Sequence, residues 1–181
     1  MGEVYLALDT ELQREVALKL INDGYSSNRV ANHLFGAEAR IAAGFSHPHS
    51  VVIHEIGKFG DRPYIAMEYV TGKSLHEVIQ SGGLSVNESL QTALQIAACL
   101  ESAHDQNIVH GDISATNVLL SDDGQAKVLD FGVSGLSGSN SPVEPITLGN
   151  PSYLAPERIH GASISPATDL FSLGVLLYYM L

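Results

Sequence analysis

The sequence has little positive charge, one cysteine and no long apolar run. Lys and Arg together number 9 against 20 Asp and Glu, so the formal net charge is −11 at pH 7. This balance argues against nucleic acid or an anionic membrane surface as the main partner, because both attract clustered cations. The single cysteine, Cys99, excludes an intrachain disulfide and lies in an apolar helical pattern, where we expect a buried, inert thiol. The composition fits a reducing compartment, and we expect a cytoplasmic location.

Targeting and membrane signals are also missing from the sequence. No signal peptide is visible at the N-terminus, and the apolar tail Leu170–Leu181 is too short to span a bilayer. We therefore expect no membrane segment in this chain. What is present is a hydrophobic content of 45% with 16% charged residues over 181 residues, which predicts one packed domain.

Two short motifs place polar side chains within apolar segments. Ile108–Leu120 reads IVHGDISATNVLL, and Val128–Gly132 reads VLDFG. A turn rich in Asp and Gly separates them, which predicts strand, turn, strand and brings Asp112, Asn117 and Asp130 together. One carboxylate can orient an attacking hydroxyl. An amide oxygen and a second carboxylate can hold Mg²⁺, which prefers oxygen ligands.

These motifs resemble the catalytic loop and the Asp-Phe-Gly metal motif of eukaryotic-type (Hanks-type) serine/threonine protein kinases. The resemblance implies that Asp112 is the catalytic base, that Asn117 and Asp130 bind Mg²⁺, and that Phe131 is a packing residue. An Ala-Pro-Glu motif follows at the expected distance. In the last helix, Asp169 matches the aspartate that braces the catalytic-loop backbone in this family.

The same resemblance implies a site for ATP. The Val-Ala-Leu-Lys strand gives Lys19 the phosphate-binding role, with Glu38 as its ion-pair partner in a helix expected over residues 28–43. Only the last glycine of the family's glycine-rich loop, Gly2, is present. The adenine is implied to lie between apolar side chains and to bond to main-chain groups of the hinge; the apolar residues are Val4, Ala17, Met67 and Leu119, and the hinge residues are Glu68 and Val70.

The implied fold class is α+β, a bilobal protein kinase-like fold. Residues 1–70 would form a small antiparallel β-sheet lobe with one helix and the hinge, and residues 71–181 an incomplete, mainly α-helical lobe. Local patterns agree, because alternating residues predict strands at 2–9, 15–20, 51–57 and 63–69. Two capping boxes predict a short helix after Ser74 and a long helix after Ser85. The apolar face expected for the long helix consists of Leu90, Ala93, Leu94, Ala97 and Ala98.

We expect the kinase domain to be truncated at both ends in this sequence. The first glycines of the glycine-rich loop and the family's last helices are not in it. The final helix would then expose apolar side chains, and we expect the chain alone to be poorly stable; the side chains concerned are Phe171, Val175, Leu176, Tyr178, Tyr179 and Leu181.

Three positions depart from the family pattern. Gly111 replaces an arginine that receives an activation-loop phosphate, Ser114 replaces the lysine that neutralises the transferred phosphate, and Asn150 replaces a threonine that bonds to that lysine.

Three functions therefore stay open. The first is a kinase that transfers the γ-phosphate of ATP to Ser/Thr hydroxyls of proteins. The second is a pseudokinase that acts as a binding scaffold. The third is a small-molecule phosphotransferase of the aminoglycoside or choline kinase type, whose loop also reads His-Gly-Asp but which generally lacks the two later motifs.

Overall fold

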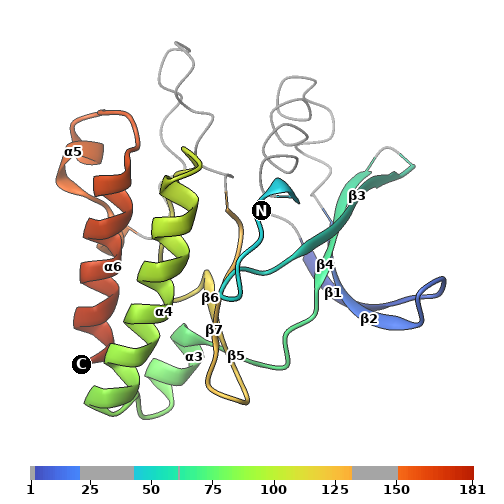
Figure 1. Cartoon of the computed structure of the whole chain (residues 1–181), viewed down its shortest axis with the longest axis horizontal. Helices are drawn as coiled ribbons and strands as arrows, with labels where there is room; N and C mark the ends of the chain where they lie inside the picture. The colour runs from blue at the N-terminus through green and yellow to red at the C-terminus, as the bar shows by residue number, and fades with distance from the viewer. Residues whose placement is uncertain (1–2, 21–42, 61, 132–150) are drawn as a thin grey trace.

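The computed structural model describes residues 3–20, 43–60, 62–131 and 151–181. Within them, a four-stranded antiparallel sheet forms one side of the molecule and helices form the other (Figure 1). The strand order is β1-β2-β4-β3, and the strands are β1 (Glu3–Asp9), β2 (Arg14–Leu20), β3 (Ile53–Phe59) and β4 (Arg62–Glu68). The helix predicted over residues 28–43 lies almost wholly outside the described residues.

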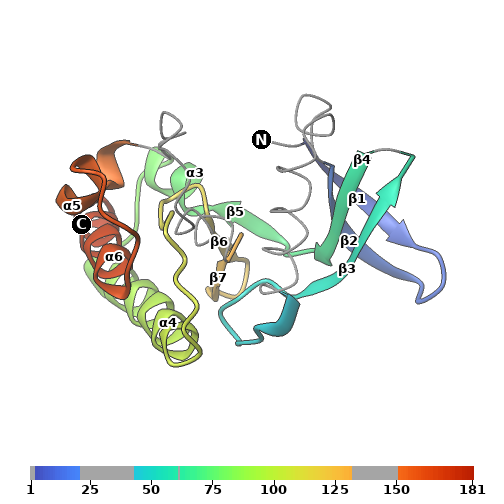
Figure 2. The ribbon, with the colours of Figure 1, turned by 90° about the horizontal axis from the view of Figure 1, so that it is seen from above.

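A second, three-stranded sheet lies between the first sheet and the helices (Figure 2). Its antiparallel strands are β5 (Gly72–Ser74), β6 (Val118–Ser121) and β7 (Ala126–Val128). The helices are α3 (Leu75–Gln80), α4 (Val86–His104), α5 (Pro156–Ile159) and α6 (Pro166–Met180), with a single helical turn at Pro151–Tyr153. β5, α5 and this turn were not predicted from the sequence, and all three are four residues or shorter.

The two predicted capping boxes are confirmed. The Ser74 hydroxyl accepts a hydrogen bond from the Glu77 amide, and the Glu77 carboxylate accepts one from the Ser74 amide. Ser85 and Glu88 make the same reciprocal pair at the start of α4. Each box satisfies amide groups that have no partner inside the first helical turn, which fixes where the helix begins.

The predicted apolar face of α4 is wrong except at Ala93, which is buried in the main core. Leu90 and Leu94 are 45% and 62% exposed, whereas Ile96, Cys99 and Leu100 are fully buried. The helix packs against α6 and the second sheet, and this selects a stripe that includes two polar residues, Ser89 and Thr92. The Ser89 hydroxyl donates to the Met180 carbonyl, so its burial leaves no lost hydrogen bond. Because two of its residues are polar, the spacing of apolar residues alone does not identify this stripe.

The main core lies between α4, α6 and the second sheet. Its fully buried side chains include Leu75, Ile96, Leu100, Ile113, Val118 and Leu176. Cys99 is buried among them as predicted, and burial raises the pKa of its thiol to about 12. A smaller cluster of Val51, Ile65 and Met67 underlies the first sheet.

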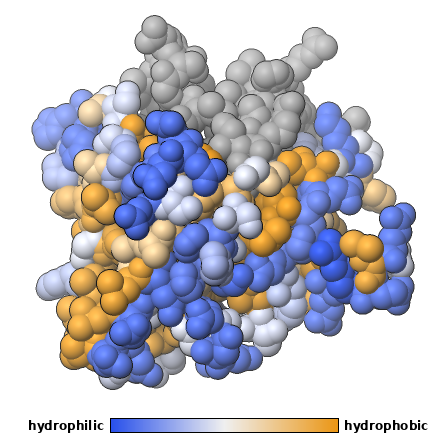
Figure 3. Space-filling view, viewed as in Figure 1, coloured by the Kyte–Doolittle hydropathy of each residue, from blue (hydrophilic) through white to orange (hydrophobic). Residues whose placement is uncertain are grey.

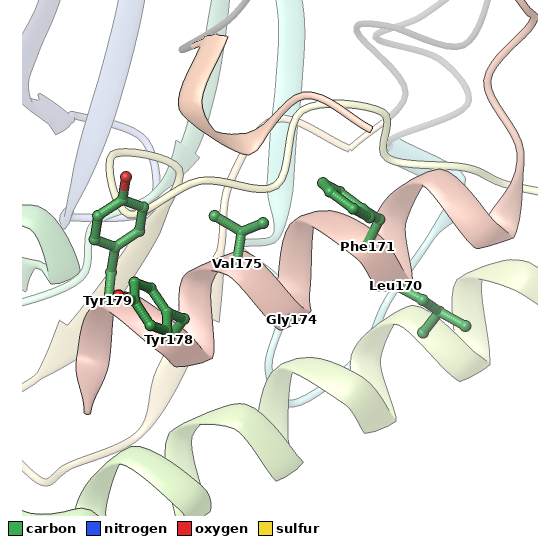
Figure 4. A pocket seen from close by; sticks show the side chains of 6 residues that line it. All are labelled: Leu170, Phe171, Gly174, Val175, Tyr178 and Tyr179. Carbon is green, nitrogen blue, oxygen red and sulfur yellow. The ribbon is translucent and has the colours of Figure 1, made fainter. Parts of the chain in front are cut away.

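One face of α6 is apolar and exposed. A shallow hollow there is lined by Leu170, Phe171, Gly174, Val175, Tyr178 and Tyr179 (Figure 4). Apolar surface gathers at the lower left of Figure 3, where α6 ends in Figure 1. The predicted exposure is confirmed for Phe171, Tyr178, Tyr179 and Leu181. Val175 is half-buried, and the prediction is wrong for Leu176, which lies in the core and is fully buried. No helix in the described residues is long and apolar enough to cross a membrane.

Candidate active site

One buried carboxylate of α6 anchors the main chain of the catalytic loop, residues 108–120. Asp169 has no exposed surface, and its two oxygens accept hydrogen bonds from the main-chain amides of His110 (2.9 Å) and Gly111 (2.7 Å). The His104 Nε2 atom lies 2.8 Å from the same carboxylate. The brace implied by the sequence is therefore present, and its third partner, His104, was missed.

The His110 ring connects the two motifs. Its Nδ1 atom accepts a hydrogen bond from the Asp112 amide at 3.2 Å, so the proton is on Nε2, which donates to the Leu129 carbonyl at 2.7 Å. Phe131 packs edge-on against this ring, with centroids 4.9 Å apart, and against Phe45 at 4.8 Å. The packing role of Phe131 is confirmed. Phe45 was missed, because nothing local marks it as the third ring of this stack.

Asp112 and Asn117 are joined directly. The Asn117 amide nitrogen donates to the Asp112 main-chain oxygen (2.8 Å) and to its carboxylate (2.9 Å). Burial raises the pKa of Asp112, and the hydrogen bond from Asn117 opposes that shift. The Asn117 main-chain carbonyl accepts a hydrogen bond from the Leu129 amide at 2.9 Å, which connects the loop to the residue before Asp130. The structure thus collects all three predicted residues in one place.

Lys19 reaches this group from the first sheet. Its Nζ atom lies 2.6 Å from Asp130 Oδ2, and both side chains are partly buried. Asp130 has a φ of 57°, in the left-handed region that costs an L-residue free energy, so the surrounding contacts hold it there. Glu38, the partner expected for Lys19, and Gly2 lie outside the described residues, and both assignments stay predictions.

The side-chain oxygens of Asn117 and Asp130 are suitable ligands for Mg²⁺. Both hydrogen bonds of the Asn117 side chain use its nitrogen, and the Asp130 ion pair uses Oδ2. Within the described part of the chain, the Oδ1 atoms of Asn117 and Asp130 have no donor. One amide and one carboxylate oxygen are therefore available on adjoining segments, and oxygen is the ligand that this hard cation takes.

The strand register places the predicted adenine contacts of the first sheet on one face. Val4 lies opposite Lys19, and Ala17 lies opposite Met67, so all four side chains point to the same side. Met67 clusters with Ala17, Val70 and Leu129. Leu119 lies on the other sheet, in β6. Leu129 was missed, although its position directly before Asp130 is a usable signal.

The main-chain amides of the two predicted hinge residues, Glu68 and Val70, differ in whether they have a backbone hydrogen-bond acceptor. The Glu68 amide donates to the Val52 carbonyl at 2.8 Å. The Val70 amide has no backbone acceptor among residues 3–20, 43–60, 62–131 and 151–181 outside the strand ladders. An unpaired amide beside an apolar cluster is suited to donate to a ring nitrogen of a flat base.

Ser114 does not present a free hydroxyl to the site. It is 3% exposed, and its oxygen lies 3.0 Å from the Thr116 hydroxyl. The loop from residue 108 to residue 120 contains no Lys or Arg. The cationic position that the family has here is therefore absent from the loop, and Asn150 lies outside the described residues.

Comparison with known proteins gives a consistent set of relatives. The family model "Protein kinase domain" matches residues 1–181. The chain is 37% identical over 183 residues to the serine/threonine-protein kinase PrkC of Bacillus subtilis (strain 168), covering 100% of this chain and 28% of that protein. It is 36% identical to the serine/threonine-protein kinase PknA of Mycobacterium tuberculosis, covering 98% of this chain and 43% of that protein.

A solved structure shares the fold. The PknI kinase domain of Mycobacterium tuberculosis aligns with a TM-score of 0.80 at 28% identity, covering 99% of this chain and 68% of that chain. The chain thus spans less than half the length of these curated relatives, and about two thirds of the solved kinase domain.

Proposed function

Because this chain belongs to the protein kinase family, we propose that the protein containing it transfers the γ-phosphate of ATP to serine and threonine hydroxyls of proteins. The predicted α+β kinase-like fold is confirmed by the solved relatives. The observation that supports the proposed activity best is the assembly of Lys19, Asp112, Asn117 and Asp130, which unites residues up to 111 positions apart.

In this proposal Asp112 is the general base. Its carboxylate accepts the proton of the substrate hydroxyl as that oxygen attacks the γ-phosphorus of ATP, the bond from the γ-phosphorus to the bridging oxygen breaks, and ADP leaves. The Asn117 side chain donates one hydrogen bond to the Asp112 carboxylate and one to the Asp112 main-chain oxygen, which fixes the position of the base. Lys19 binds phosphate oxygens of ATP. Asn117 and Asp130 would hold Mg²⁺, which supplies positive charge to the phosphates when bound.

Asp130 has two tasks that use different oxygens. Its Oδ2 atom orients the Lys19 ammonium, and its Oδ1 atom is left for the metal. The left-handed backbone at this residue and the His110–Leu129 hydrogen bond before it fix where the carboxylate lies. Catalysis of this kind depends mainly on positioning and charge, which the arrangement provides without forming a covalent bond between the protein and the phosphate.

A second candidate, a pseudokinase that binds nucleotide without transferring phosphate, is favoured by Ser114. A lysine there would place a charge next to the transferring phosphate, whereas this hydroxyl is buried and bonded to Thr116. Lys19, Asp112, Asn117 and Asp130 are all present and brought together, so the active kinase remains our proposal.

We also propose that the protein acts in the cytoplasm, because its single cysteine fits a reducing compartment.

The test is phosphotransfer from ATP to a protein substrate by the protein in its full natural length, followed by identification of the phosphorylated amino acid. Asp112→Asn should leave ATP binding intact and lower turnover by about 10²–10⁴-fold, which is the usual contribution of a positioned base. The matched control is Asp122→Asn, at an exposed turn. ATP binding with no transfer by the wild-type protein would support the pseudokinase, and a mutant within threefold of wild type would show that Asp112 is not the base.

A further inference from the structure

An ion pair joins the hinge to the second sheet. Lys127 of β7 places its Nζ atom 2.7 Å from Glu68 Oε1, at the last residue of β4. The two side chains are only 18% and 28% exposed, so solvent screens the charges less than at a fully open surface. This pair takes no part in the mechanism proposed above.

Glu68 is held on its other side as well. Its second carboxylate oxygen, Oε2, accepts a hydrogen bond from the Val52 amide at 3.2 Å, and its own amide donates to the Val52 carbonyl at 2.8 Å. Both carboxylate oxygens and the amide are thus engaged. A fixed side chain limits the movement of the main chain that carries it, and that main chain begins the hinge.

Lys127 extends from a strand that is bonded on both sides. Its neighbour Val128 donates to the His49 carbonyl at 2.8 Å and accepts from the Val51 amide at 3.0 Å. Across the ladder, Lys127 lies opposite Leu119 of β6. Three residues further along the chain is Asp130. The ion pair therefore connects the hinge with the short, well-anchored segment that ends at the predicted metal ligand.

We propose that Lys127 is a positioning residue for the nucleotide. Through Glu68 it fixes the separation between the hinge, where the base would bind, and Asp130, where the phosphates and metal would bind. A nucleoside triphosphate must fit both ends at once, so a looser separation weakens its binding. This inference rests on the proposed use of ATP but not on phosphate transfer, because it concerns binding alone.

The perturbation is Lys127→Met, which keeps most of the unbranched side chain and removes the charge. In the full-length protein we expect the KM and the Kd for ATP to rise about three- to tenfold with little change in kcat, as for loss of one partly buried ion pair. Lys127→Arg should keep the affinity within twofold of wild type. The control is Lys73→Met, an exposed lysine of the same sheet with no ion pair in the described part of the chain.

A double-mutant cycle separates positioning from stability. Glu68→Gln keeps an oxygen for the Val52 amide and removes the charge, so Glu68→Gln with Lys127→Met should weaken ATP binding no more than either single change. Thermal unfolding of each variant reports stability independently. An unchanged Kd in Lys127→Met, or additive effects in the cycle, would overturn the inference. A wild-type protein that binds no ATP would overturn the proposed function too, so the two failures are distinguishable.

Discussion

Replacing Asp169 should cost more stability than any other single polar change in the described site. Its carboxylate is completely buried and accepts hydrogen bonds from the His110 and Gly111 amides and from His104. Asp169→Ala leaves these donors without their acceptor. A buried group that loses its partner costs about 1–3 kcal/mol, and the two main-chain amides together give about 2–6 kcal/mol. Whole domains are stable by only about 5–15 kcal/mol.

Asp169→Asn gives a finer measurement because the shape is kept. One oxygen of the carboxylate serves Gly111 and the other serves His110 and His104, and the asparagine NH₂ group must face one of these two sets. At least one donor then meets another donor, and we expect a loss of about 1–3 kcal/mol, half or less of the alanine effect.

The assay is urea denaturation of the full-length protein, comparing transition midpoints at constant slope. Asp105→Asn, at an exposed position one residue beyond α4, is the matched control and should lie within about 0.5 kcal/mol of wild type. If Asp169→Asn were equally neutral, the carboxylate would not brace the loop, and the reasoning from buried donors would be refuted.

Three further predictions concern the base, the missing cation and the exposed helix face. Burial raises the pKa of Asp112, and the deprotonated form is the active base; the acid limb of kcat/KM should therefore lie above the ordinary aspartate range, and a limb within that range would contradict this. Ser114→Lys should raise turnover by up to about tenfold by adding charge near the phosphate, and a slower variant would show that the loop works without it. Tyr178→Ser should reduce self-association of the 181-residue chain in size-exclusion chromatography, whereas Leu94→Ser on α4 should not; a monomeric wild-type chain would refute the patch argument.

Local sequence signals predicted the parts of the fold that local chemistry determines. Ser85 and Glu88 define the start of α4 because each satisfies the amide of the other, and this requires no distant residue. The strand pattern placed β1, β2 and β4 within one or two residues. Motif spacing likewise identified Asp112, Asn117 and Asp130, because the turn between β6 and β7 returns the chain to the same place.

Tertiary contacts decided what the sequence could not show. The buried stripe of α4 depends on where α6 and the second sheet pack, so Leu90 and Leu94 were assigned to the wrong face. The Lys127–Glu68 pair joins residues 59 positions apart, and neither has a local feature that marks the other. Phe45 and Phe131 likewise pack together although they are far apart in the sequence, and no local feature marks either as the partner of the other.

The Mg²⁺ dependence of ATP binding tests most directly whether Asn117 and Asp130 form the metal site of an ATP-binding protein. If Asn117 and Asp130 hold the metal, the wild-type full-length protein should bind ATP more tightly with Mg²⁺ than without it, as measured by titration calorimetry. Asp130→Ala should abolish that difference, because it removes the carboxylate ligand and frees Lys19 from its partner. An equal affinity with and without Mg²⁺ in both proteins would show that Asn117 and Asp130 do not hold the metal.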